Sequence, residues 1–248
     1  MIKIENFEVL GWEHAIRGMR NPKNSWEKSD TRICDVKEAC ECDDCPALSI
    51  RDGEFSFCTQ PFIIGPNDHK LMMSLAKGGP VHAKYRRMIT VYVDITAPLY
   101  WWKEFDTYKV GTVANSCSTM HKIHAKEFEV WDFSFEKLIG KIDDNWDIAA
   151  GPECRSTPLD ILEDVINALN VYREKYLETK DKKYWWQMIQ LLPTSYNQKR
   201  TVMLNYEVLH NIYHSRKNHK LDEWHAFCDW IKSLPYSEII LAEETGIE

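Results

Sequence analysis

The chain has 248 residues with a formal net charge of −7, and 44% of the residues are hydrophobic, as in a globular protein with a substantial core. The acidic balance excludes a protein that coats nucleic acid, but it leaves room for one small phosphorylated ligand. No apolar stretch can span a bilayer and the first residues lack the apolar run of a signal peptide, so we expect a cytoplasmic protein with no membrane and no nucleic-acid polymer as a partner.

Short elements are expected in the first 80 residues. Residues 2–7 indicate a first strand, and residues 13–20 are typical of a short helix. Arg17 and Arg20 share one face of that helix, and two solvated side chains are the ordinary interpretation of such a pair. Residues 67–77 predict a second helix, which ends at a pair of glycines and a proline.

Residues 29–61 form a polar, turn-rich segment, which we interpret as a cysteine-rich insertion within a single domain of residues 1–248. It holds five of the eight cysteines: Cys34, Cys40, Cys42, Cys45 and Cys58. Without a secretory signal the thiols are expected to be reduced, and four of them would suffice for a tetrahedral zinc site. Cys42 and Cys45 have the spacing of a zinc knuckle, but no second C-x-x-C pair completes the pattern. Bound zinc is therefore one hypothesis, and free thiols or a disulfide are the alternatives.

The rest of the chain is organised around residues 87–123. Residues 88–96 alternate β-branched and polar side chains, which predicts a strand with one buried face that ends at Pro98. An aromatic helix is expected over residues 99–109, followed by a small, polar loop over residues 111–119. This strand, helix and loop make a plausible ligand-binding unit, although an ordinary core hairpin has the same pattern.

Four helices are expected in the C-terminal half. The first begins with Thr157-Pro158-Leu159-Asp160, which combines a threonine cap, a proline at the first position and an acid three residues after the cap. The others are predicted over residues 184–192, 203–217 and 221–233, and residues 194–200 are expected to be a polar connection. With no internal repeat and no convincing linker, the pattern predicts one α+β domain.

Few local motifs in this sequence carry chemistry by themselves. It contains no G-x-G-x-x-G, no P-loop and no G-x-S-x-G, so nucleotide-binding Rossmann and Walker sites are not expected. His210 and His214 have the spacing of a helical metal pair, but without an accompanying E-x-x-H pattern we interpret them as surface side chains. Cys117 would suit a nucleophile, although a lone cysteine is more often inert.

An ordered set of short matches resembles the flavin-dependent thymidylate synthase family, ThyX. It consists of a helix with A-x-R-x-x-R, then a glycine and a histidine, a strand ending in A-P, an aromatic helix, a polar loop, L-P and finally N-x5-N-x4-R. The matching residues are Ala15, Arg17, Arg20, Gly79, His82, Ala97, Pro98, Leu192, Pro193, Asn205, Asn211 and Arg216.

The sequence departs from the family at its signature, which is R-H-R followed by seven residues and a serine. Counted from Ala97-Pro98, the three signature positions hold Thr107, Tyr108 and Lys109, and the serine position holds Cys117. Only one of three cations is kept, and planar arginine is poorly replaced by threonine or tyrosine.

The resemblance implies an α+β fold with a small antiparallel sheet and packed helices, and a homotetramer with active sites at subunit junctions. It also implies FAD, with NADPH and methylenetetrahydrofolate as co-substrates, and methylation of dUMP or a related pyrimidine nucleotide at C5 to give dTMP. The resemblance also implies the roles of ten residues. The phosphate would be held by Arg216 and by Lys199 or Arg200. The base would be lined by Asn115, Ser116 and Cys117, and the flavin would be faced by His82, Lys109, Asn205 and Asn211.

A variant within this class would modify the C5 position differently. Two alternatives belong to other classes. One is a non-catalytic ThyX-like protein that binds a nucleotide or a protein partner. The other is a thiol-dependent enzyme that uses Cys117.

Overall fold

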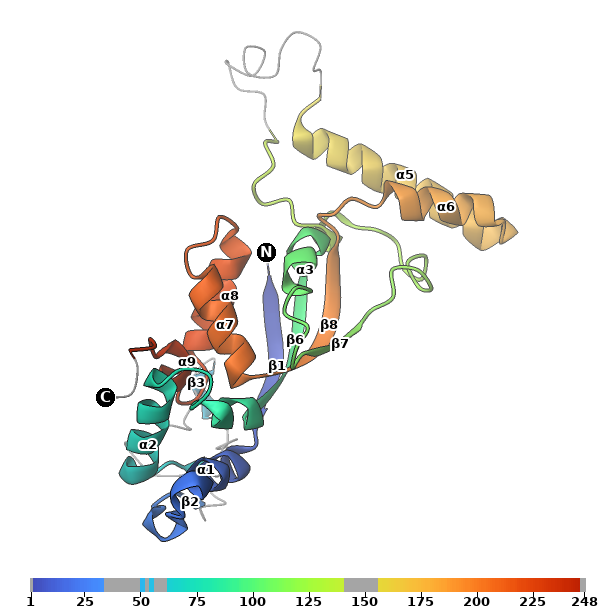
Figure 1. The fold of residues 1–248 in the computed structure, drawn as a ribbon. Coiled ribbons are helices and arrows are strands. Elements are labelled where there is room, and N and C mark those ends of the chain that lie inside the picture. The colour runs from blue at the N-terminus through green and yellow to red at the C-terminus, as the bar shows by residue number, and fades with distance from the viewer. Residues whose placement is uncertain (1, 34–49, 52–53, 56–61, 141–155, 246–248) are drawn as a thin grey trace. The chain divides into compact units, whose positions relative to one another are not determined.

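The computed structural model describes residues 2–33, 50–51, 54–55, 62–140 and 156–245, and its largest sheet has four strands (Figure 1). Its strand order is β1 (Lys3–Leu10), β6 (Thr90–Pro98), β8 (Asn197–Asn205) and β7 (Val113–Ser116). The alternation expected for β6 is confirmed, because Val91, Val93 and Ile95 are buried whereas Tyr92 is 43% exposed. The predicted α+β class with a small antiparallel sheet is confirmed at the level of the fold.

Two small antiparallel pairs of strands lie in or beside the cysteine-rich segment. β2 (Arg32–Ile33) pairs with β5 (Phe62–Ile63), and β3 (Ile50–Arg51) pairs with β4 (Glu54–Phe55). The five thiols proposed as zinc ligands, Cys34, Cys40, Cys42, Cys45 and Cys58, lie outside the described residues. The cysteine-rich insertion therefore stays a prediction from the sequence.

The chain divides into two compact units, and each is described separately. The first comprises residues 1–3, 96–107 and 115–200, and the second comprises residues 4–95, 108–114 and 201–248. The prediction that residues 1–248 form a single domain stays a prediction.

The first unit contains the long helix α5 (Pro158–Thr179) and the shorter α6 (Lys182–Leu191), which lie side by side (Figure 1). The predicted start of α5 is confirmed, because the Asp160 amide donates to the Thr157 hydroxyl and the Thr157 amide donates to the Asp160 carboxylate. The unit also contains α3 (Leu99–Phe105) and the short η4 (Val130–Asp132). Its buried core consists of Ile123, Phe128, Phe133, Leu162, Ile166, Leu169 and Met188.

The second unit combines its part of the sheet with several helices. These are α1 (Trp12–Arg20), η1 (Asn21–Lys23), η2 (Trp26–Lys28), α2 (Pro66–Lys77), η3 (Lys84–Met88), α7 (Tyr206–Arg216), α8 (Asp222–Lys232) and α9 (Glu238–Leu241). Tyr206 is fully buried, packs edge-on against Trp12 and donates from its hydroxyl to the carbonyl of Pro235. No helix among the described residues is long and apolar enough to cross a membrane.

Two predicted boundaries were wrong. β8 extends through residues 203–205, which were expected to begin a helix, because Val202 and Leu204 alternate with Thr201 and Met203 and are fully buried. The helix begins only after Asn205. The aromatic helix is also shorter than expected, since α3 ends at Phe105 and Lys109 lies beyond it.

Candidate functional site

Strands β7 and β8 bring together the residues of the first unit that were expected to bind the nucleotide. The Cys117 amide donates to the Lys199 carbonyl at 2.9 Å, and the Gln198 side-chain amide donates to the Cys117 carbonyl at 2.7 Å. Asn115, Ser116 and Cys117 are exposed, and Lys199 is half-buried. A small, polar, exposed loop end thus lies beside a cation on the neighbouring strand.

Arg200 on β8 has a fixed orientation. Its Nε donates to Gln198 Oε1 at 3.0 Å, and one terminal nitrogen lies 2.7 Å from a carboxylate oxygen of Asp106. The guanidinium carbon is 4.1 Å from the centroid of the Trp102 ring, whose Nε1 donates to the Gln198 carbonyl. The Trp102 ring and the hydrogen bonds together fix the orientation of this planar group, and one of its nitrogens already pairs with a carboxylate.

Trp102 and Gln198 were not among the predicted site residues. Gln198 and Arg200 are two residues apart, so they point to the same face of a strand. That spacing would have indicated their contact if residues 197–205 had been recognised as a strand.

Arg216, at the end of α7 in the second unit, is also held in place. Its Nε donates to the hydroxyl of Tyr108 at 2.9 Å, and its guanidinium carbon lies 4.9 Å from the Trp224 ring centroid. Tyr108 occupies one of the three altered signature positions. The hydroxyl that replaces a cation there now accepts a hydrogen bond from the cation that was expected to hold phosphate.

Asn205 is the cap of α7. Its side-chain oxygen accepts from the backbone amides of Glu207 at 3.1 Å and Val208 at 3.0 Å. Gly111, with φ of +79°, approaches so closely that a Cβ at this position would lie 2.9 Å from Asn205 Nδ2. Asn205 therefore has a structural role at the junction of β8 and α7, whatever its part in binding.

The other residues expected to face flavin are His82, Lys109 and Asn211, and all three are exposed. Among the described residues, no hydrogen bond or ion pair joins any two of these three and Asn205. The backbone amide of His82 donates to the carbonyl of Gly79 at 3.0 Å, which fixes the turn that follows α2.

A buried charged group that the sequence pattern does not indicate lies between η3 and α7. Arg86 is fully buried, and its terminal nitrogen lies 3.7 Å from Glu207, which also lies 3.9 Å from Arg87. Within the described part of the chain, neither the nitrogens of the Arg86 guanidinium nor His214 Nε2 has a hydrogen-bond partner. Burial raises the pKa of Glu207, although the two arginines oppose that rise.

The interpretation of both α7 histidines as surface side chains was wrong. His210 is only 6% exposed, and its Nδ1 donates to the carbonyl of Ile240 at 2.7 Å. His214 is half-buried, and its ring centroid lies 4.4 Å from that of His210. Burial lowers the pKa of His210 and of His214, so both are neutral near pH 7.

Comparison with solved structures relates the whole chain to one fold. Two crystal structures of thymidylate synthase X from Helicobacter pylori, both with FAD and dUMP, match 98% of this chain. The match covers 98% and 97% of the lengths of the two Helicobacter pylori chains, with TM-scores of 0.59 and 0.57. The sequence identity is 16% in both cases. The fold is ThyX-like. No protein-family model and no curated protein sequence matches, so the likeness rests on structure.

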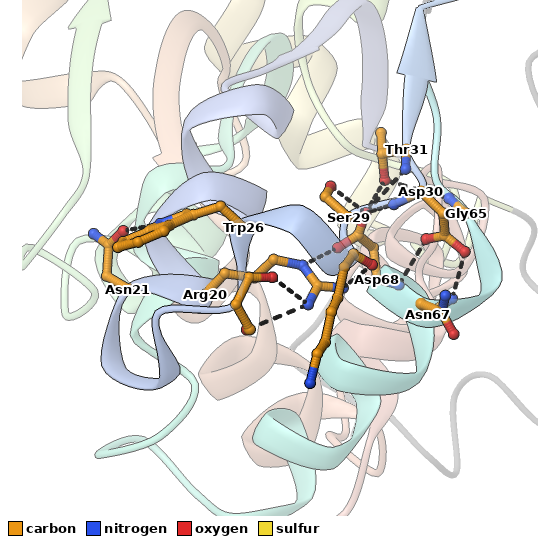
Figure 2. A network of polar contacts seen from close by, with 11 residues as sticks. Arg20, Asn21, Trp26, Ser29, Asp30, Thr31, Gly65, Asn67 and Asp68 are labelled. Carbon is orange, nitrogen blue, oxygen red and sulfur yellow. Dashed lines mark hydrogen bonds and ion pairs between the residues drawn. The ribbon is translucent and has the colours of Figure 1, made fainter.

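The A-x-R-x-x-R helix of the ThyX resemblance holds a structural arginine (Figure 2). Arg20 was expected to be solvated but is 4% exposed, because its Nε pairs with a carboxylate oxygen of Asp68 at 2.6 Å. The other oxygen of Asp68 accepts from the hydroxyls of Ser29 and Thr31, both at 2.7 Å. Arg17 remains exposed beside His14, as expected.

The environment of Asp68 lowers its pKa. Burial by itself would raise the pKa, but the hydrogen bonds from Thr31, Ser29 and Arg20 outweigh it and favour the charged carboxylate. A cavity of about 210 Å³ adjoins this network and is lined by Glu13, Ile16, Arg17, Arg20, Trp26, Ser29, Thr31 and Phe62.

A second cavity, of about 340 Å³, lies in the first unit, at the end of the α5–α6 pair. None of the ten predicted substrate and flavin residues lines either cavity. Within the described part of the chain, no group of three or more His, Cys, Asp or Glu side chains could hold a metal ion.

Proposed function

We propose that this protein is a ThyX-like flavoenzyme that transfers a one-carbon unit from methylenetetrahydrofolate to C5 of dUMP and so produces dTMP. FAD would be the cofactor and NADPH the reductant. The observation that carries the proposal is the match of nearly the whole chain to ThyX structures that contain FAD and dUMP.

Arg216 and Arg200, with Lys199, are the proposed phosphate ligands. Both guanidinium groups are oriented by an aromatic ring and a hydrogen bond, so little side-chain entropy would be lost when an anion binds. Asn115 and Ser116 would then contact the base. Their exposed polar side chains suit the carbonyl and imide groups of a uracil ring.

His82, Lys109, Asn205 and Asn211 are the proposed flavin contacts. The residues present fit an anionic cofactor rich in acceptors, because η3 also carries the Arg86 guanidinium. None of its nitrogens has a hydrogen-bond partner among the described residues, although one lies 3.7 Å from Glu207. When bound, reduced flavin supplies the hydride and relays the one-carbon unit, and the protein's part is to orient the reactants and exclude water.

Cys117 replaces the serine of the family signature. It is exposed, its backbone is fixed by Lys199 and Gln198, and the proposed chemistry requires no protein nucleophile. Cys117→Ser should therefore keep most of the activity. A thiol-dependent enzyme would lose essentially all of it.

The direct test uses the purified full-length chain supplied with FAD, NADPH, methylenetetrahydrofolate and dUMP. Bound yellow flavin, saturable dUMP binding by calorimetry, and dTMP identified by mass spectrometry are expected. A colourless protein that takes up neither FAD nor dUMP would overturn the proposal.

The alternative is a ThyX-like protein that binds a nucleotide without methylating it, or that modifies C5 differently. Its support is the altered signature, in which Tyr108 bonds to Arg216 where the resemblance places a cation. Binding of FAD and dUMP without dTMP would favour it, and a product of another mass would identify a different modification.

A further inference from the structure

The cavity at the end of the α5–α6 hairpin has the features of a second ligand site. Its volume of about 340 Å³ falls at the lower end of the range for small-molecule pockets. The residues that line it are Met120, His121, His124, Tyr176, Lys180, Lys182 and Trp185. Two of these seven are lysines, two are histidines and none is acidic, so the cavity favours an anion.

The ammonium groups of the two lysines make cation–π contacts with aromatic rings that line the cavity. Lys180 Nζ lies 5.8 Å from the Tyr176 centroid, and Lys182 Nζ lies 6.0 Å from the Trp185 centroid. The acid between them in sequence, Asp181, pairs with Lys183 at 3.0 Å and accepts from the Lys183 amide. Its charge is therefore offset by a lysine that does not line the cavity.

The backbone at Lys180 supports a role beyond packing. This residue ends α5 with φ of +57°, in the left-handed region that normally favours glycine or asparagine. A lysine in this conformation is strained, and backbone strain of this kind is concentrated at functional sites.

His124 adds a polar atom to the cavity. Its Nδ1 is buried and makes no hydrogen bond to any described residue, while its ring packs edge-on against Tyr176 at 4.9 Å. Trp185 is positioned by a hydrogen bond from Nε1 to the carbonyl of Met120 at 3.0 Å. The cavity thus combines a fixed indole, a phenol ring and several cationic or hydrogen-bonding groups.

We propose that this cavity binds a small phosphate ester that carries an aromatic ring, of about the size of a mononucleotide. Lys180, Lys182 and His121 would contact the phosphate oxygens, and the rings of Tyr176 and Trp185 would pack against the aromatic group. The site goes beyond the proposed methylation of dUMP, because it uses none of the residues assigned to dUMP or flavin.

Calorimetric titration of the full-length protein with adenosine 5′-monophosphate tests this site. Lys180→Gly removes the cation while placing the preferred residue at a positive φ, so the melting temperature should stay the same or rise. Binding should weaken about tenfold, as expected when a charged hydrogen bond is lost. Lys182→Gln should weaken it similarly. The control Lys175→Gln removes an exposed lysine of α5 that does not line the cavity, so it should leave binding unchanged.

Inorganic phosphate and adenosine, titrated separately, resolve the two halves of the ligand. Each should bind more weakly than the monophosphate. Absence of binding at millimolar monophosphate, equal effects of Lys182→Gln and Lys175→Gln, or full affinity in Lys180→Gly would overturn the proposal. Phosphate that binds as tightly as the monophosphate would contradict the aromatic contact.

The same variants separate this site from the proposed function. Lys180→Gly and Lys182→Gln should bind dUMP normally, and Arg216→Ala should bind adenosine monophosphate normally. If Arg216→Ala instead abolishes binding of adenosine monophosphate, the ligand occupies the dUMP site and the second site is overturned.

Discussion

Arg216 donates from Nε to the hydroxyl of Tyr108 at 2.9 Å, which joins the end of α7 to an altered position of the ThyX-like signature. The guanidinium also lies over Trp224, 4.9 Å from its ring centroid. These contacts make Arg216 more than a solvated cation at a helix end. They orient the group, and they also make it part of the packing of the second unit.

We expect Arg216→Ala to weaken dUMP binding about tenfold to a hundredfold, because a charged hydrogen bond contributes about 1.5–3 kcal/mol. The variant should also unfold more easily, by about 0.5–2 kcal/mol for the lost cation–π contact. Calorimetry and urea denaturation measure the two effects.

Arg216→Lys is the matched control, since it keeps the charge and loses the planar fork. It should bind dUMP with intermediate affinity. Unchanged dUMP affinity in Arg216→Ala would remove Arg216 from the site.

The cysteine-rich segment is predicted to bind one zinc ion through four of its five cysteines. Elemental analysis of protein purified without chelators should give about one zinc per chain. Cys42→Ser, which removes one thiol of the knuckle pair, should lower the zinc content, and Cys228→Ser is a control at a buried cysteine far along the chain. Less than about a tenth of an equivalent of zinc, with all five thiols reactive, would contradict the prediction.

The ThyX resemblance predicts a homotetramer. Large apolar side chains are exposed in this chain, including Val110 at 92%, Trp131 at 75% and Val113 at 62%, and burial between subunits would stabilise an assembly. Light scattering should give a mass four times that of the 29.2 kDa chain. A monomer at working concentration would count against both the tetramer and the catalytic proposal.

Strong local signals were enough to predict several elements. The threonine cap, proline and acid at residues 157–160 specify a helix start by their own hydrogen bonds, and the structure has that start. The strand β6 was likewise predicted from the sequence, because burial of one face of a strand produces the alternation of apolar and polar residues. β8 was misjudged because Asn205 suits a helix cap, and its polar residues hide the alternation of Val202 and Leu204.

Partners distant in the sequence could not be predicted from spacing. Arg20 and Asp68 are 48 residues apart, so the helix pattern around Arg20 does not indicate the carboxylate that pairs with this buried arginine. His210 is buried, and its Nδ1 donates a hydrogen bond to the carbonyl of Ile240, which lies 30 residues further along the chain. At the candidate site, the family resemblance selected Arg200 and Arg216, but the aromatic rings that orient them depend on the tertiary fold.

The ion pair between Arg20 and Asp68 is expected to be essential for the stability of the second unit. Asp68→Asn would leave a buried guanidinium without its counter-charge, which costs about 3–5 kcal/mol. Urea denaturation should show that loss. Glu13→Gln, on the exposed side of the same helix, is the control and should change stability by less than about 0.5 kcal/mol.

Lowering the pH should remove the stability that the Asp68 carboxylate contributes to the folded protein. Its pKa is lowered in the folded protein, because three hydrogen-bond donors outweigh the effect of burial, so the folded state prefers the carboxylate more than the unfolded chain does. The resulting stability is fully present above the unfolded-state pKa, near 3.9, and is lost as the pH falls through the lower folded-state value. The difference in unfolding free energy between wild type and Asp68→Asn should therefore be constant from about pH 7 to pH 5 and shrink below about pH 4. A difference that stays constant down to pH 2 would show that the carboxylate charge contributes nothing to the network and that Asp68 acts by shape alone.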